Sequence, residues 1–127
     1  LVNKILELNK ITFISLGMVN LNNRPFGNSS NIKYLWCQSD YPTYPWNIKN
    51  FPKDFVSEDF FGYSDHSVGI DMAILSISRG AKLVEKHFTL DKSDNTIRDH
   101  ALSATPNEFG TLVEIGRSMY NNLKLNI

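Results

Sequence analysis

The stretch FFGYSDHSVGIDMAILSISRGAKLVEKHF, residues 60–88, decides the fold of this chain. It predicts a strand over residues 60–63, a polar loop, an apolar helix over residues 69–79 and a second strand over residues 82–87. Gly80 is typical of a helix end. A strand–helix–strand unit of this length joins parallel neighbours by a right-handed crossover. The stretch therefore predicts an α/β protein with a parallel sheet.

A histidine stands at the end of each strand of this unit, His66 after the first and His87 in the second. Parallel neighbours lie about 4.8 Å apart, so we expect the two imidazoles side by side at the carboxyl end of the sheet. Ligands bind at that end in α/β proteins, and two neutral imidazoles can hold a divalent metal ion. A single histidine at a strand end is more often packed or hydrogen-bonded, so spacing alone leaves both interpretations open.

The rest of the chain continues the alternation of strands and helices. We expect a short helix over residues 1–9, strands over residues 11–16 and 33–37, a loop over residues 20–31, short turns within residues 47–58 and a polar loop over residues 91–104. A last helix is predicted from Thr105, followed by Pro106 and Glu108 in the pattern of an N-cap, a first-turn proline and a capping glutamate. Four parallel strands make half of a (β/α)₈ barrel.

Composition narrows the function classes. The chain has 127 residues, of which 42% are hydrophobic and 20% charged, and its formal net charge is zero. No basic run alternates with aromatics, so nucleic acid is not an expected partner. No apolar run is long enough for a membrane span, so a membrane is not expected either. The single cysteine, Cys37, favours a reducing compartment, and we predict a cytoplasmic protein.

Four motifs carry a resemblance to a known family: CQSDYP at residues 37–42, GYSDHSVG at residues 62–69, EKHFTL at residues 85–90 and DHALS at residues 99–103. In their order and spacing they resemble the sialic acid (N-acetylneuraminate) synthase family, the phosphoenolpyruvate-dependent nonulosonate synthases. The resemblance covers most of residues 10–120. Gln38 departs from the family's usual threonine, and residues 20–31 are too few for the helix expected after the first strand.

The resemblance implies a fold and a reaction. The 127 residues would be one partial domain, the second half of a catalytic TIM-type (β/α)₈ barrel. The family condenses phosphoenolpyruvate with an N-acetylmannosamine-type sugar to a nine-carbon 2-keto acid and releases phosphate. We therefore expect these two substrates, a divalent metal ion, Mn²⁺ or Mg²⁺, and a homodimer of the full-length protein.

The resemblance also assigns metal-binding and catalytic roles. It implies that His66 and His87 are the metal ligands and that both act as catalytic residues together with Asp99. Glu85 shares a strand face with His87 because side chains alternate along a strand. We expect Glu85 to orient a metal ligand by contacting that ligand and not the metal ion.

Substrate contacts follow in the same way. Ser39 and Ser64 match serines that hold the phosphate of phosphoenolpyruvate, and Ser15 is expected with them, although capping or packing is the commoner role of such a serine. Tyr41 and Asp99 match residues that face the sugar. Each also has an ordinary alternative, because a tyrosine before a proline can simply pack and an aspartate can simply end a turn.

The sequence leaves two other functions open. One is a non-catalytic remnant or binding module that keeps the sugar and phosphate pocket. The other is a metal-dependent barrel aldolase or lyase with no connection to sialic acids. The chain also starts at Leu1 without a methionine, and we expect it to be a piece of a longer protein that is inactive by itself.

Overall fold

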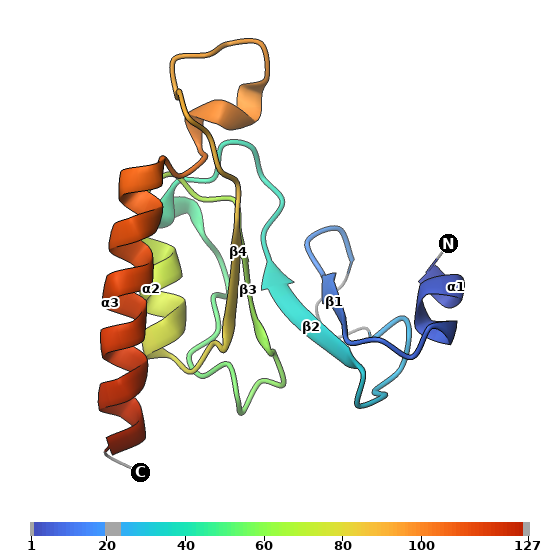
Figure 1. Cartoon of the computed structure of the whole chain (residues 1–127). Helices are drawn as coiled ribbons and strands as arrows, with labels where there is room; N and C mark the ends of the chain where they lie inside the picture. The colour runs from blue at the N-terminus through green and yellow to red at the C-terminus, as the bar shows by residue number, and fades with distance from the viewer. Residues whose placement is uncertain (1, 20–23, 126–127) are drawn as a thin grey trace.

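Four parallel strands form one sheet in the order β1-β2-β3-β4. The computed structural model describes residues 2–19 and 24–125. The strands are β1 (Thr12–Ser15), β2 (Ile32–Cys37), β3 (Gly62–Asp65) and β4 (Leu83–Lys86), and the helices are α1 (Val2–Glu7), α2 (Asp71–Ser78), α3 (Pro106–Leu125) and the 3₁₀ turns η1 (Pro45–Asn47) and η2 (Arg98–Ala101). The curled sheet, with α2 and α3 beside β3 and β4 and α1 at the β1 end, is half of a (β/α)₈ barrel, as predicted (Figure 1).

The strand–helix–strand unit forms as its sequence predicts. Helix α2 buries Met72, Ala73 and Ser76 against the sheet. Its end is fixed by Gly80, whose φ of +91° lies in the left-handed region that favours glycine. Helix α3 packs beside α2 and the two lie together next to β3 and β4 (Figure 1).

An aromatic cluster covers the outer face of β2 and β3, and the described residues that connect these two strands form no α-helix. Trp36 and Tyr63 are each 1% exposed, and Phe55 from the loop before β3 is fully buried. The ring of Phe51 packs edge-on against Trp36, with centroids 5.1 Å apart. Apolar loop side chains thus take the place of a covering helix between β2 and β3.

The opposite, inner face carries the residues that lead to the candidate site. Cys37 pairs with Ser64, and Ser64 pairs in turn with Glu85, so these three side chains share one layer. The layer below includes Gly62, where an added Cβ would lie 2.1 Å from the carbonyl oxygen of Leu83. Glycine therefore permits β3 and β4 to approach each other at this point.

The described strands and the helices α1 and α2 begin and end within two residues of their predicted bounds. Two differences from prediction affect the packing. The strand predicted over residues 60–63 was placed two residues too early, because Phe60 turns into the aromatic core and pairing with β4 begins at Gly62. The polar loop over residues 91–104 is not uniformly exposed: it contains η2, and Ala104 is buried and bridges Phe88.

The other expected elements are confirmed within the described residues. Residues 24–31 form a loop without helix or strand, as predicted, and residues 20–23 of that loop lie outside the described part. Thr105 precedes α3, and Pro106 is its first residue. Among the described residues, no helix has the length and apolar character needed to cross a membrane.

Candidate active site

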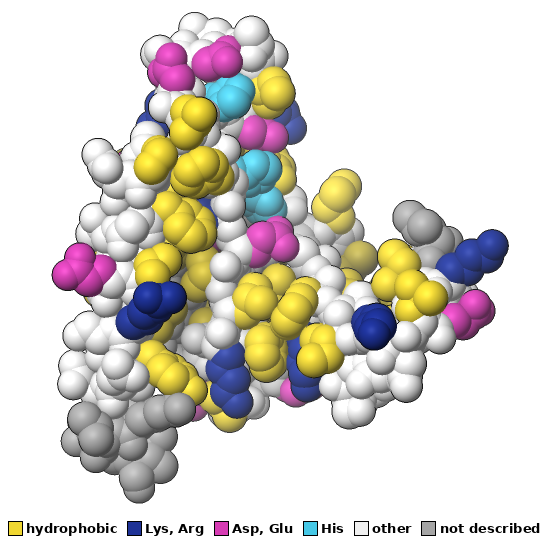
Figure 2. Space-filling model, in the orientation of Figure 1, with side chains coloured by type: hydrophobic (Ala, Val, Ile, Leu, Met, Phe, Trp, Pro, Cys, Tyr) yellow, Lys and Arg dark blue, Asp and Glu magenta, His cyan; other side chains and the backbone are white. Residues whose placement is uncertain are grey.

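The two predicted metal ligands lie next to each other. His66 follows β3 directly and His87 follows β4 directly, and their ring centroids are 5.2 Å apart. Both side chains are partly buried. Figure 2 shows histidine and acidic side chains gathered on the upper part of the visible face, above a cluster of hydrophobic side chains. The structure therefore brings together the two histidines that the strand–helix–strand pattern placed at one sheet edge.

Cys37, to which the sequence analysis assigned no role in the site, contacts His66. It is buried, and its Sγ lies 3.2 Å from Nδ1 of His66. Burial acts to raise the pKa of the thiol, yet hydrogen bonds with His66, Ser15 and Ser39 outweigh it and lower the pKa. The same contact raises the pKa of His66 against the opposing effect of burial. A proton shared at Nδ1 leaves Nε2 free to bind a metal ion.

Two of the predicted phosphate-binding serines surround the same sulfur. Ser39 Oγ lies 3.5 Å from Cys37 Sγ, and Ser15, at the end of β1, is close enough to lower the pKa of the thiol. Gly17 leaves room for the side chains of Ser39 and Cys37, because a Cβ at this position would lie 2.1 Å from Ser39 Oγ and 2.5 Å from Cys37 Sγ. The hydroxyls of β1 and β2 therefore converge on one point at the carboxyl end of the sheet.

The third serine already has a partner. Ser64 Oγ donates a hydrogen bond of 2.9 Å to Oε1 of Glu85, its register neighbour on β4. Glu85 is on the face of His87, as predicted, and Lys86 is on the other face, where it is buried. The described contact of Glu85 is thus with a serine one layer below the histidines.

The sugar-facing residues predicted from the family lie at the rim. The centroid of the Tyr41 ring lies 4.9 Å from that of the His66 ring. The same Tyr41 ring also contacts Arg98, whose guanidinium carbon lies 4.9 Å from the ring centroid. Burial, and then the charges of Cys37 and Asp99, raise the pKa of the Tyr41 hydroxyl. The loop after β2 holds this position, because Val68 N–H donates to Thr43 O at 2.9 Å.

Asp99 is the second residue of η2, after Arg98, and one of its side-chain oxygens has no hydrogen-bond partner in the described structure. Its Oδ1 is buried, makes no hydrogen bond in the described structure, and lies 3.6 Å from Nε of Arg98. A buried acceptor without a hydrogen-bond donor is costly, and such atoms are frequently completed by a ligand or ion. Arg98 was missed by sequence reasoning; its place directly before the DHALS motif was the available signal.

The donor set fits an open metal site rather than a closed one. Within residues 2–19 and 24–125, no group of three or more histidine, cysteine, aspartate or glutamate side chains is arranged to hold a metal ion. His66 and His87 supply two nitrogens, so remaining positions would be filled by water or by substrate oxygens. Open positions are what a catalytic ion needs, whereas a structural ion is fully enclosed by protein ligands.

Known proteins are similar to this chain in sequence and in fold. The chain is 34% identical to the N,N'-diacetyllegionaminic acid synthase of Campylobacter jejuni, covering 95% of this chain and 41% of that protein. It is 36% identical to the human N-acetylneuraminate-9-phosphate synthase over 65% of this chain and 24% of that protein. The crystal structure of the sialic acid synthetase of Leptospira borgpetersenii superimposes with a TM-score of 0.73 at 26% identity, over 96% of this chain and 47% of that one.

These matches define the family and the extent of the chain. The chain spans less than half of the length of each of these relatives. The family model described as the NeuB family matches residues 1–126. The chain, with its four-stranded half-barrel and its pair of strand-end histidines, therefore belongs to the NeuB family.

Proposed function

We propose that this chain is the half of a nonulosonate synthase barrel that holds a divalent metal ion and contacts both substrates. The reaction is the condensation of phosphoenolpyruvate with an N-acetylmannosamine-type sugar to a nine-carbon 2-keto acid, with release of phosphate. The observation that carries the proposal is the contact of the His66 and His87 rings, 5.2 Å apart at the carboxyl edge of a half-barrel. The relatives named above, which are synthases of such acids, support it.

His66 and His87 would hold Mn²⁺ or Mg²⁺ by two imidazole nitrogens. A bound ion of this kind supplies a Lewis acid for the aldehyde oxygen of the sugar. Cys37 keeps the ring of His66 in one orientation through the contact at Nδ1, 3.2 Å away. Asp99, whose buried Oδ1 makes no hydrogen bond in the described structure, has an acceptor to offer to a sugar hydroxyl.

The serines would bind the phosphate. Ser39 and Ser15 present hydroxyl donors at the ends of β2 and β1, where they already converge on Cys37. Ser64 can donate to a phosphate oxygen only if it releases Glu85, to which it now donates at 2.9 Å. Tyr41 would pack against the sugar from the rim, held between His66 and Arg98.

The test replaces the two histidines in the intact protein. His66→Ala and His87→Ala should each abolish phosphate release from phosphoenolpyruvate in the presence of Mn²⁺ and N-acetylmannosamine. Each should also weaken metal binding about tenfold or more, measured by elemental analysis after dialysis against a range of Mn²⁺ concentrations. His100→Ala is the matched control, since this third histidine is held by Thr89 Oγ1 at 2.7 Å from Nδ1 and should leave the metal content unchanged.

Three outcomes would contradict the proposal. Wild-type metal content in both histidine variants would show that His66 and His87 do not bind the metal ion. Turnover with pyruvate in place of phosphoenolpyruvate, without phosphate release, would identify an aldolase or lyase instead. An intact protein that binds both substrates without any product would be a binding module.

A further inference from the structure

A buried ion pair lies directly behind the two histidines. Asp65, the last residue of β3, pairs in register with Lys86, the last residue of β4. Lys86 Nζ lies 3.0 Å from Oδ2 of Asp65, and the two side chains are 1% and 0% exposed. Both point away from the inner face, because neighbouring side chains alternate along a strand. The pair therefore joins β3 and β4 at the residues that immediately precede His66 and His87.

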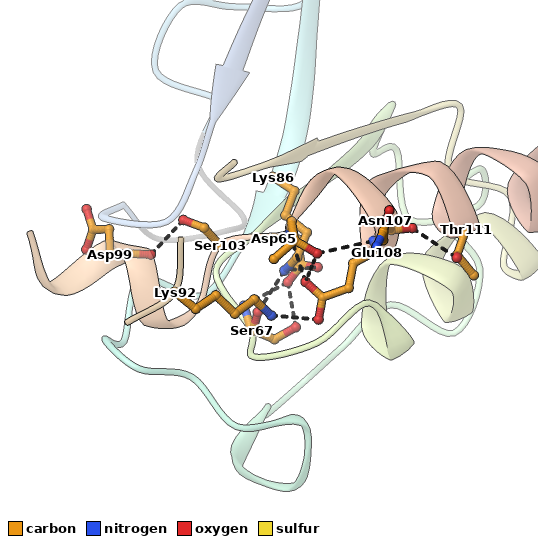
Figure 3. A network of polar contacts seen from close by, with 10 residues as sticks. Asp65, Ser67, Lys86, Lys92, Asp99, Ser103, Asn107, Glu108 and Thr111 are labelled. Carbon is orange, nitrogen blue, oxygen red and sulfur yellow. Dashed lines mark hydrogen bonds and ion pairs between the residues drawn. The ribbon is translucent and has the colours of Figure 1, made fainter. Parts of the chain in front are cut away.

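Ser67, the residue that follows His66, is hydrogen-bonded to both members of this ion pair. Oδ1 of Asp65 accepts hydrogen bonds from the Ser67 backbone N–H at 2.7 Å and from its hydroxyl at 2.6 Å. Lys86 Nζ also donates to the backbone oxygen of Ser67 at 2.7 Å. Figure 3 shows Asp65, Ser67 and Lys86 converging from the two strand ends. Thus both chain neighbours of His66 are bonded to the residue that precedes His87.

Stability alone is a weak explanation for such a pair. Moving two charges out of water carries a desolvation cost that often exceeds their attraction, and apolar residues of similar volume are commonly as stable or more stable. An ion pair differs from an apolar contact in being directional and fixed in length. Its position beside the two histidines points to a role in geometry.

Strand register decides whether the histidines can act together. A slip of one residue between β3 and β4 would turn one ring to the opposite face of the sheet. We propose that the Asp65–Lys86 ion pair is a clamp that holds His66 and His87 on one face at a fixed separation, so that both can bind one divalent ion. This inference rests on the metal site proposed above. Asp65 and Lys86 are positioning residues that act through the histidines.

The test uses the intact protein with both charges replaced together. Asp65→Leu combined with Lys86→Met fills the space with apolar side chains and leaves no unpaired charge, so the fold should be retained. The matched control is Lys92→Met, which removes the partly exposed pair of Lys92 with Glu108, 2.6 Å apart, without touching β3 (Figure 3). Thermal unfolding checks that each variant is folded.

Two measurements then separate positioning from stability. In the metal-free protein, the nuclear Overhauser effect between the His66 and His87 ring protons should weaken or vanish in the double variant and persist in Lys92→Met. Mn²⁺ binding by calorimetry should weaken about 10- to 100-fold in the double variant. A folded double variant with an unchanged Overhauser effect and wild-type affinity would overturn the clamp.

Two other results also decide the question. If the double variant fails to fold, Asp65→Asn replaces it, since asparagine keeps an oxygen for Ser67 but loses the charge that attracts Lys86. The same loss of Mn²⁺ affinity is then expected, and wild-type affinity would overturn the clamp. If the wild-type protein itself binds no Mn²⁺, the proposed metal site is wrong, and the Overhauser effect alone decides whether the ion pair sets the separation of the rings.

Discussion

The two ends of the sheet differ in how firmly they are held. Every residue of β3 is buried, and α2 and α3 lie together beside β3 and β4 (Figure 1). At the other end, the residues of β1 alternate between partly buried and exposed, Phe13 is 45% exposed, and α1 buries none of its residues. The difference lies in cover: one end has two helices and a buried ion pair, and the other has a short helix and a loop.

This contrast matches the roles proposed for the residues at each end of the sheet, metal binding at one end and phosphate binding at the other. The histidines, whose separation a metal ion constrains tightly, stand on the well-covered strands β3 and β4. Ser15, a hydroxyl donor, stands on the thinly covered strand β1. Hydrogen bonds to a phosphate tolerate more variation in position than metal coordination does.

Replacing Trp36 by alanine should have the largest effect on stability. Trp36 is 1% exposed and contacts Phe51 and Tyr63, so truncation leaves a cavity and should cost about 3–5 kcal/mol. Phe13→Ala on β1 should cost much less, because 45% of that residue is exposed. Urea unfolding of this 127-residue chain measures both, and equal losses would show that β1 is as well covered as the neighbouring strand β2, which carries Trp36.

Two glycine substitutions should sharpen the comparison. Gly62→Ala places a methyl group 2.1 Å from the Leu83 carbonyl oxygen, which is backbone and cannot turn aside. The strain should cost about 1–3 kcal/mol or more. Gly17→Ala meets the side chains of Ser39 and Cys37 instead. A rotation of Ser39 relieves part of that clash, so Gly17→Ala should destabilise less, and the opposite ranking by urea unfolding would show that β1 is the more rigid end.

Much of this arrangement could be predicted from sequence. The strand–helix–strand unit was predictable because the apolar run and Gly80 define its helix, and strands on either side of such a helix are parallel. That topology placed His66 and His87 together, and the structure confirms their proximity. The alternation rule also placed Glu85 on the face of His87, as found, since Ser64 and Glu85 pair in one layer of the sheet below the histidines.

Other contacts depend on tertiary packing that a local pattern does not contain. The pairing of Asp65 with Lys86 requires the register of β3 against β4, and β3 begins two residues later than its sequence predicted. Cys37 meets His66 across 29 positions, and Arg98 reaches Tyr41 from another loop. The metal, the substrates, the dimer and the cytoplasmic location stay predictions.

The start of α3 gives the smallest expected effect, a dependence of stability on pH. The Glu108 carboxylate accepts a hydrogen bond of 2.6 Å from the Lys92 ammonium. It also accepts one of 2.8 Å from the Thr105 backbone N–H, which is the arrangement of a capping box. The hydrogen bond with Lys92, and then that with Thr105, lower the pKa of Glu108. A carboxyl whose pKa is lower in the folded state contributes stability above its unfolded pKa and loses it as the pH falls through its folded pKa.

The stability difference between the wild-type chain and Glu108→Gln should therefore be full near pH 7 and shrink as the pH falls below the usual range for a glutamate. Because the Glu108 side chain is 35% exposed, water and salt screen the pair. The difference should thus stay below about 1 kcal/mol and shrink further in about 1 M salt.

Glu114→Gln, at an exposed position on the same helix, corrects for the loss of one negative charge. Urea unfolding across this pH range gives the two curves. A difference for Glu108→Gln that grows as the pH falls would mean that the neutral carboxyl is the better partner at the start of α3, contrary to the sign of its pKa shift.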